Sequence, residues 1–170
     1  MQLNIPGIKK FTQISFFYCS DLSAGRHIIE SRIRKSVKRV TRCDIFTDGV
    51  LLEEDTNPDI SAPFDVLLSC FTLECSCIDF EHFATALKNL SALVRSGGGF
   101  ILIGFSRGCP WKAGEYTFPH LKTDENDIRN ALADAGFRKI EIKVMGQEGE
   151  KGDFKYKNFD KMFCTTAEKI

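Results

Sequence analysis

The amino-acid sequence predicts a single α/β domain built on a largely parallel sheet. Two short, continuously apolar runs, residues 64–71 and 100–105, are typical of strands that are buried on both faces. A helical pattern lies between them, and strands that alternate with helices along a chain favour parallel pairing. The 170 residues are enough for one hydrophobic core, and 43% of them are hydrophobic.

The N-terminal part of the chain is expected to hold two further strands and a helix. Residues 11–19 are β-branched and aromatic, which indicates a buried strand. Apolar residues at helical spacing predict a helix over 26–39, and the run 40–46 is then interpreted as a strand. Residues 47–63 contain glycine and two prolines, so we expect a loop there.

A helix and a glycine-rich turn are expected between the two buried strands. Asp79 is a good helix N-cap, and an apolar stripe runs from Phe80 to Val94. Gly97 suits the left-handed position that ends a helix, and the next two glycines would let the chain reverse. Phosphate-binding glycines follow a strand and open a helix. Because the order is the opposite here, the sequence predicts a turn and not a phosphate loop.

The C-terminal part predicts one more helix and two strands. Thr123, or the acids beside it, caps a helix that Gly136 closes. Residues 138–145 alternate as a strand, and residues 161–168 form the last strand.

Composition excludes several classes of function. The 23 basic and 23 acidic residues cancel, so no overall field attracts nucleic acid or a membrane. No apolar run approaches the roughly 20 residues of a membrane span. Seven scattered cysteines are typical of reduced thiols in a cytoplasmic protein. Cys75 and Cys77 lack a second pair at zinc spacing and the three histidines stand alone, so no metal site is expected.

The predicted topology points to one region for a ligand. Ligands of such sheets bind beyond the carboxyl ends of the strands. Asp44 and residues 70–74 and 104–115 lie there, and they are the candidate functional residues.

Five segments, in order and spacing, resemble the family of nicotinamide, phenylethanolamine and indolethylamine N-methyltransferases. These segments are KRVTRCDI (38–45), FDVLLSCFTLE (64–74), LVRSGGGFILIG (93–104), AGEYTF (113–118) and ALADAGF (131–137). The resemblance is strongest over residues 33–145, within a single domain that spans 1–170.

The resemblance implies a Rossmann-like methyltransferase sheet, largely parallel with a C-terminal antiparallel strand. It also implies that the domain is incomplete, because the family's first strand, glycine-rich cofactor loop and N-terminal lid have no counterpart in the 170 residues. We therefore expect a truncated chain, a splice form or a degenerate family member.

The cofactor implied by the resemblance is S-adenosylmethionine. Asp44 and the backbone of Ile45 would hold the adenine, and Cys70 and Phe71 would line the pocket beside the adenosyl and methionine portions. The resemblance does not settle whether Asp21 stands in for the acid that holds the ribose.

The implied substrate is a small amine or pyridine. Glu74 and Glu115 match acidic positions that face the substrate amine and would act as catalytic residues, while Trp111 matches an aromatic residue that covers the substrate. Lys157 and Asn158 replace acids of the phenylethanolamine enzyme, which argues against catecholamine-like substrates.

Two alternatives remain open from the sequence. The first is a cytoplasmic N-methyltransferase, monomeric when complete, with no nucleic-acid or membrane partner. The second is an inactive remnant that binds the cofactor weakly or not at all.

Overall fold

The computed structural model describes residues 22–52, 62–106, 110–146 and 161–170. The strand expected over 11–19, residues 53–61 of the loop expected over 47–63, Asp21, Lys157 and Asn158 lie outside these ranges. The elements are α1 (Leu22–Ser36), β1 (Phe64–Cys70), α2 (Leu73–Ser76), α3 (Phe80–Ser91), β2 (Val94–Ser106), β3 (Trp111–Ala113), β4 (Tyr116–Phe118), α4 (Glu125–Asp134), β5 (Phe137–Gly146) and β6 (Lys161–Lys169).

The central sheet has the strand order β1-β2-β6-β5. β1 and β2 are parallel, whereas β6 runs antiparallel to both of its neighbours. It follows that β1, β2 and β5 share one direction and that, among the described strands of this sheet, only β6 is reversed. The predicted α/β sheet with a C-terminal antiparallel strand is confirmed.

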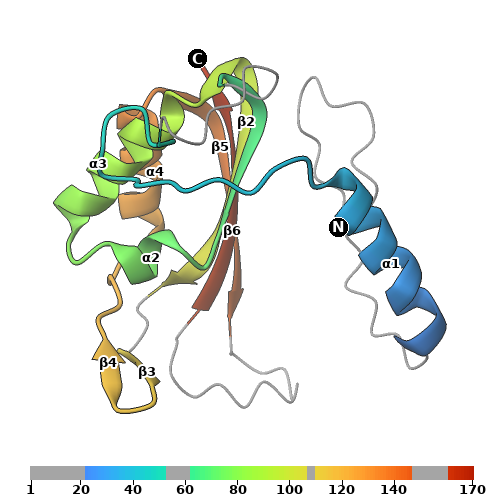
Figure 1. Ribbon diagram of the computed structural model, residues 1–170. Coiled ribbons are helices and arrows are strands. Elements are labelled where there is room, and N and C mark those ends of the chain that lie inside the picture. Colours follow the sequence, from blue (N-terminus) through green and yellow to red (C-terminus); the bar gives the residue numbers. More distant parts are fainter. Residues whose placement is uncertain (1–21, 53–61, 107–109, 147–160) are drawn as a thin grey trace.

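The core lies between this sheet and three helices. Figure 1 shows α2, α3 and α4 on one face of the sheet and α1 on the opposite side. Phe83 and Leu87 of α3 pack with Phe100 and Leu102 of β2 and with Leu132 of α4, and each is at most 2% exposed. Alternate residues of β2 face these helices, as the pleat of a strand requires.

Both predicted helix N-termini are confirmed by their caps. The Asp79 carboxylate accepts a hydrogen bond from the His82 N–H at the start of α3. Asp124, one of the acids beside Thr123, caps α4 in a capping box with Asp127. The stripe predicted from Phe80 to Val94 is wrong at its two ends: Phe80 is 42% exposed, and Val94 is the first residue of β2.

Gly97 adopts the left-handed conformation, with φ of +72°. It does so inside β2 and not at the end of α3, so its predicted role as a helix cap is wrong. The register with β1 shifts between Phe64 and Val66, which places the glycines in a bulge. A Cβ on Gly98 would lie 2.9 Å from the Asp65 carbonyl oxygen, so only glycine allows this close approach.

The strand predicted over residues 40–46 is wrong. Cys43 forms an isolated antiparallel bridge with Leu51, and the Asp44 N–H donates to the Val50 carbonyl. The chain makes a compact turn here: Val50, just after the run, is 1% exposed in the core, and the Ile45 carbonyl accepts a hydrogen bond from Asn89 of α3, whereas Val40 is 88% exposed.

Two further elements differ from the prediction. A hairpin, β3–β4, in which Trp111 lies opposite Phe118, forms where no strand was predicted. The short helix α2 was not predicted at all. Helix α1 is confirmed, but Ile29 and Ile33 of its apolar stripe are 59% and 58% exposed.

Candidate functional site

The candidate site lies where β1 and β2 end side by side. Cys70 of β1 is opposite Ile103 of β2, and the Phe71 N–H continues the ladder to the Ile103 carbonyl at 2.8 Å. Phe71 has a φ of +52°, which is uncommon for a residue with a side chain. Its ring stacks on Phe105 with centroids 4.6 Å apart. This backbone conformation places a partly exposed aromatic side chain at the carboxyl end of β1, with Phe71 39% exposed.

The thiol of Cys70 is beside this surface. Desolvation raises the pKa of Cys70, and the nearby Glu74 carboxylate raises it further. A raised pKa favours the neutral thiol, which suits Cys70 to polarizable packing more than to nucleophilic attack.

Glu74 is the most buried of the predicted site residues, with 2% of its surface exposed. It lies on α2, directly after the turn that follows β1. Its Oε1 accepts a hydrogen bond from the Phe105 N–H at 3.2 Å. Burial raises the pKa of Glu74, and the hydrogen bond from Phe105 lowers it in part. Among the described residues, Oε2 has no hydrogen-bond partner.

Two residues that the sequence did not single out lie beside Glu74. Ligand atoms of Glu74, Cys75 and His120 all lie within 4.8 Å of one another. His120 is thus isolated in the sequence but lies beside Glu74 and Cys75 in the fold. The Leu121 N–H donates to the Glu74 carbonyl at 2.8 Å and holds the two chain segments together. No local spacing signals this contact, because 45 positions separate Cys75 from His120.

Asp44 and Ile45 lie in the turn that packs on α3. Asp44 is exposed, and its Oδ1 accepts a hydrogen bond from the Phe46 N–H at 2.9 Å. Asn89, which holds the Ile45 carbonyl, belongs to the last turn of α3, the end that leads into the start of β2. The described contacts of this turn are thus to α3 and not to Cys70 or Phe71.

Glu115 occupies the turn between β3 and β4, and its side chain is exposed. The hairpin projects beyond α2 (Figure 1), and Trp111 lies at its start. Glu74 is buried on α2, where its carboxylate faces Phe105 of β2, so the two predicted catalytic carboxylates do not share one surface. Their catalytic roles stay predictions.

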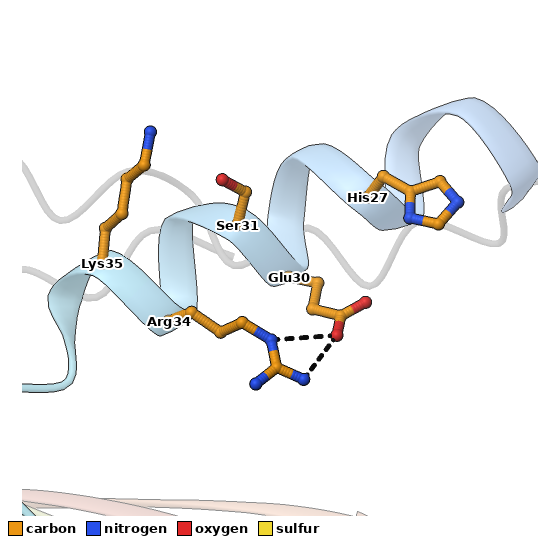
Figure 2. Close-up of a pocket in the computed structure, with 5 residues that line it drawn as sticks. All are labelled: His27, Glu30, Ser31, Arg34 and Lys35. Atoms are coloured by element: carbon orange, nitrogen blue, oxygen red, sulfur yellow. Dashed lines mark hydrogen bonds and ion pairs between the residues drawn. The ribbon is translucent and has the colours of Figure 1, made fainter.

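An open pocket is also present on α1, away from these residues. Figure 2 shows its lining side chains, His27, Glu30, Ser31, Arg34 and Lys35, with an ion pair between Arg34 and Glu30 at 2.8 Å. All five residues are exposed on one helix, and none is a predicted site residue. A surface ion pair of this kind contributes little to stability.

Comparison with solved structures defines the class of fold. An S-adenosylmethionine-dependent methyltransferase from Clostridium acetobutylicum aligns with a TM-score of 0.50 and 14% identity, over 86% of this chain and 71% of that one. The arrangement of sheet and helices is thus that of S-adenosylmethionine-dependent methyltransferases.

Comparison of sequences defines the family. The NNMT/PNMT/TEMT family model matches residues 23–170, and the chain belongs to this family. Indolethylamine N-methyltransferase of Oryctolagus cuniculus is 28% identical over 134 residues, which are 78% of this chain and 49% of the relative. Phenylethanolamine N-methyltransferase of Sus scrofa is 32% identical over 115 residues, 68% of this chain and 40% of the relative. The predicted family is confirmed.

The chain spans about half the length of the curated relatives it matches. Among the helices of the described ranges, none combines the length and the apolar character that a membrane crossing needs.

Proposed function

We propose that residues of this chain form a site that transfers a methyl group from S-adenosylmethionine to the nitrogen of a small amine or pyridine. The observation that supports this most is the buried carboxylate of Glu74, which follows β1 directly and is bonded to the end of β2. This is the end of a parallel strand pair at which α/β sheets bind their ligands. Membership in a family whose named relatives are N-methyltransferases supports this type of reaction.

The residues at the end of β1 fit the cofactor chemically. Phe71 offers an exposed ring face for a flat or cationic group, and the neutral thiol of Cys70 is a soft, apolar neighbour for sulfur. By resemblance to the family, Asp44 and the backbone of Ile45, in the turn that packs on α3, would hold the adenine, and the exposed Asp44 carboxylate can accept from its amino group. When bound, S-adenosylmethionine supplies a methyl group on a positively charged sulfur.

The acidic residues would prepare the acceptor. An amine must present a lone pair, and a carboxylate can attract the ammonium form and take its proton directly or through water. Glu115, exposed at the tip of the β3–β4 turn, is suited to attract a cation from solvent. Glu74 is held at the end of β2 and has a raised pKa, which makes it a stronger base than an exposed carboxylate. Trp111, at the base of the same hairpin, would cover the substrate.

The setting we infer is a reducing, cytoplasmic one. Cys43, Cys70, Cys75, Cys77 and Cys164 are all free thiols. Free buried cysteines such as Cys77 are typical of proteins that stay in a reducing compartment.

Radiolabelled methyl transfer to a panel of aliphatic amines and pyridines tests the proposal, together with titration calorimetry using S-adenosylhomocysteine. Turnover above background, lost in a Phe71→Ala variant, supports it. Binding without turnover would favour a cofactor-binding protein that is not an enzyme. The absence of both cofactor binding and turnover would favour the inactive remnant.

A further inference from the structure

Two buried acceptor atoms point to a bound cation, beyond the role of base proposed for Glu74. Glu74 Oε2 and His120 Nε2 are both buried, and neither has a hydrogen-bond partner among the described residues. A buried polar atom without a partner costs about 1–3 kcal/mol, so folded proteins seldom leave two of them close together. The Cys75 thiol completes a group whose ligand atoms lie within 4.8 Å of one another.

We propose that Glu74, Cys75 and His120 form a binding site for one divalent transition-metal ion of the zinc type. The three side chains offer one oxygen, one sulfur and one nitrogen, which is a mixture that zinc accepts in tetrahedral sites. Magnesium and calcium prefer oxygen ligands alone, so the thiol and the imidazole argue against them. Three protein ligands leave the fourth tetrahedral position for water or another small donor.

The hydrogen bonds around the three ligands are those expected of a second shell. His120 Nδ1 lies 2.9 Å from the Leu121 carbonyl oxygen. A carbonyl can only accept, so Nδ1 carries the hydrogen and Nε2 keeps its lone pair for a metal. A metal-binding histidine usually has its other nitrogen fixed in this way, commonly by a carbonyl. In the same manner, the Phe105 N–H occupies Glu74 Oε1 and leaves Oε2 free.

The backbone also holds the ligands in place. The hydrogen bond from the Leu121 N–H to the Glu74 carbonyl joins the segment before α4 to α2. His120, the residue next to Leu121, can therefore move away from Glu74 only if this hydrogen bond breaks. The Cys75 N–H donates to the Thr72 carbonyl and fixes α2. The frame is therefore present before a metal arrives.

Charge balance favours a dication over the proton. On binding, the Cys75 thiol releases its proton to solvent and becomes a thiolate, while Glu74 binds as a carboxylate and His120 as neutral imidazole. The two negative charges equal the charge of the metal, so the occupied site is neutral in a buried environment. The inference does not rest on the proposed methyl transfer, although both involve Glu74.

Cobalt is the probe for the test, since its spectrum reports thiolate coordination. The 170-residue chain, treated with a chelator and dialysed, is titrated with Co²⁺ under reducing conditions, and Zn²⁺ is then added as competitor. We expect one Co²⁺ per chain, a thiolate-to-cobalt charge-transfer band, and loss of the band on addition of Zn²⁺. Cys75→Ser should abolish the band, while Glu74→Gln and His120→Gln should each weaken binding by more than about tenfold.

Matched controls identify the ligands. Cys43→Ser removes an exposed thiol in the turn before β1, and His82→Gln removes an exposed imidazole on α3, so both should bind Co²⁺ like the unchanged chain. Circular dichroism shows whether each variant keeps its secondary structure. If Glu74→Gln fails to fold, Cys75→Ser still decides, because it replaces a sulfur with an oxygen of similar size.

Three results would overturn the site. The first is the absence of stoichiometric Co²⁺ binding by the unchanged chain. The second is a charge-transfer band that survives Cys75→Ser. The third is a loss of Co²⁺ affinity in the control variants as large as in the ligand variants. Calorimetry with S-adenosylhomocysteine on the same samples separates the two proposals, because metal binding and cofactor binding are read independently.

Discussion

Gly104 lies so close to Glu74 that a Cβ at this position would be 2.8 Å from the carboxylate Oε1. The same Cβ would be 2.8 Å from Cζ of Phe163 in β6. Real Cβ atoms do not approach other atoms this closely, so a side chain at position 104 must displace one of its neighbours. The absence of a side chain at Gly104 is thus what lets Glu74 reach the Phe105 N–H.

Gly104→Ala should displace the Glu74 carboxylate and break its hydrogen bond to Phe105. Overpacking of this kind costs about 1–3 kcal/mol, which urea denaturation can measure. The double variant Gly104→Ala with Glu74→Ala is the control, because removal of the carboxylate makes room. A penalty of the same size in both backgrounds would show that Phe163, and not Glu74, is the neighbour that matters.

Phe71→Ala should reduce the free energy of S-adenosylhomocysteine binding by more than it reduces the free energy of unfolding. The stack on Phe105 contributes about 0.5–1.5 kcal/mol to stability, whereas the exposed ring is the proposed cofactor surface. Phe71→Tyr keeps the ring and should keep the affinity measured by calorimetry. Phe80→Ala, at an exposed aromatic residue on α3, is the matched control and should leave binding unchanged. Equal affinity of Phe71→Ala and the unchanged chain would remove Phe71 from the site.

Glu168 should make stability fall in acid. The carboxylate accepts hydrogen bonds from Lys139 Nζ at 2.8 Å and from Arg138 Nη2 at 2.6 Å, and these partners lower the pKa of Glu168 below its ordinary value of 4.5. The unfolded chain therefore binds a proton at a pH where the folded chain does not. The stabilisation is complete above about pH 4.5 and is lost as the pH falls through the lower folded value.

Glu168→Gln should accordingly lower the melting temperature at pH 7 and flatten its dependence on pH below about pH 5. Thermal denaturation followed by circular dichroism between about pH 3 and pH 7 measures both effects. Glu141→Gln, at an exposed residue of β5, should change neither. A Glu168→Gln profile parallel to that of the unchanged chain would show that other groups cause the acid sensitivity.

Leu68 and Leu67 provide a paired test of whether β1, an edge strand among those described, causes self-association. Among the described strands, β1 is bonded only to β2, and Leu68 is 60% exposed while Leu67 packs against the core. An edge strand with an exposed leucine tends to self-associate. Leu68→Lys should shift light scattering toward monomer without lowering stability, whereas Leu67→Lys should destabilise the fold. Unchanged association in Leu68→Lys would mean that another surface is responsible.

The parts of the fold that the sequence predicted correctly depend on local rules. The runs 64–71 and 100–105 are short, apolar and bounded by turn residues, and both form strands of the sheet. Asp79 and Asp124 cap helices because a short carboxylate can reach the free N–H groups of the first turn. Such signals act within a few residues, so one sequence suffices to read them.

The errors arise where long-range contacts decide. The run 40–46 has the composition of a strand, but Asn89 of α3 binds the Ile45 carbonyl and Val50, just after the run, is buried in the core, so the chain folds back. His120 approaches Cys75 only because a backbone hydrogen bond joins Leu121 to Glu74 across two elements. Neither contact has a periodicity or a spacing that a single sequence reveals.

The exposed position of Glu115 makes the sharpest test of the proposed chemistry. An aliphatic amine is largely protonated at neutral pH, so it must be attracted and deprotonated before methyl transfer, whereas the lone pair of a pyridine needs no base. Glu115→Gln keeps the size of the side chain and removes its charge. We expect it to reduce kcat/KM for aliphatic amines by about 10²-fold or more and to change the value for pyridines much less. Radiolabelled transfer to both classes gives the ratio, with Glu141→Gln as the control for loss of one exposed carboxylate. If both classes of acceptor slow equally, Glu115 acts on the fold or on cofactor binding and not on the amine.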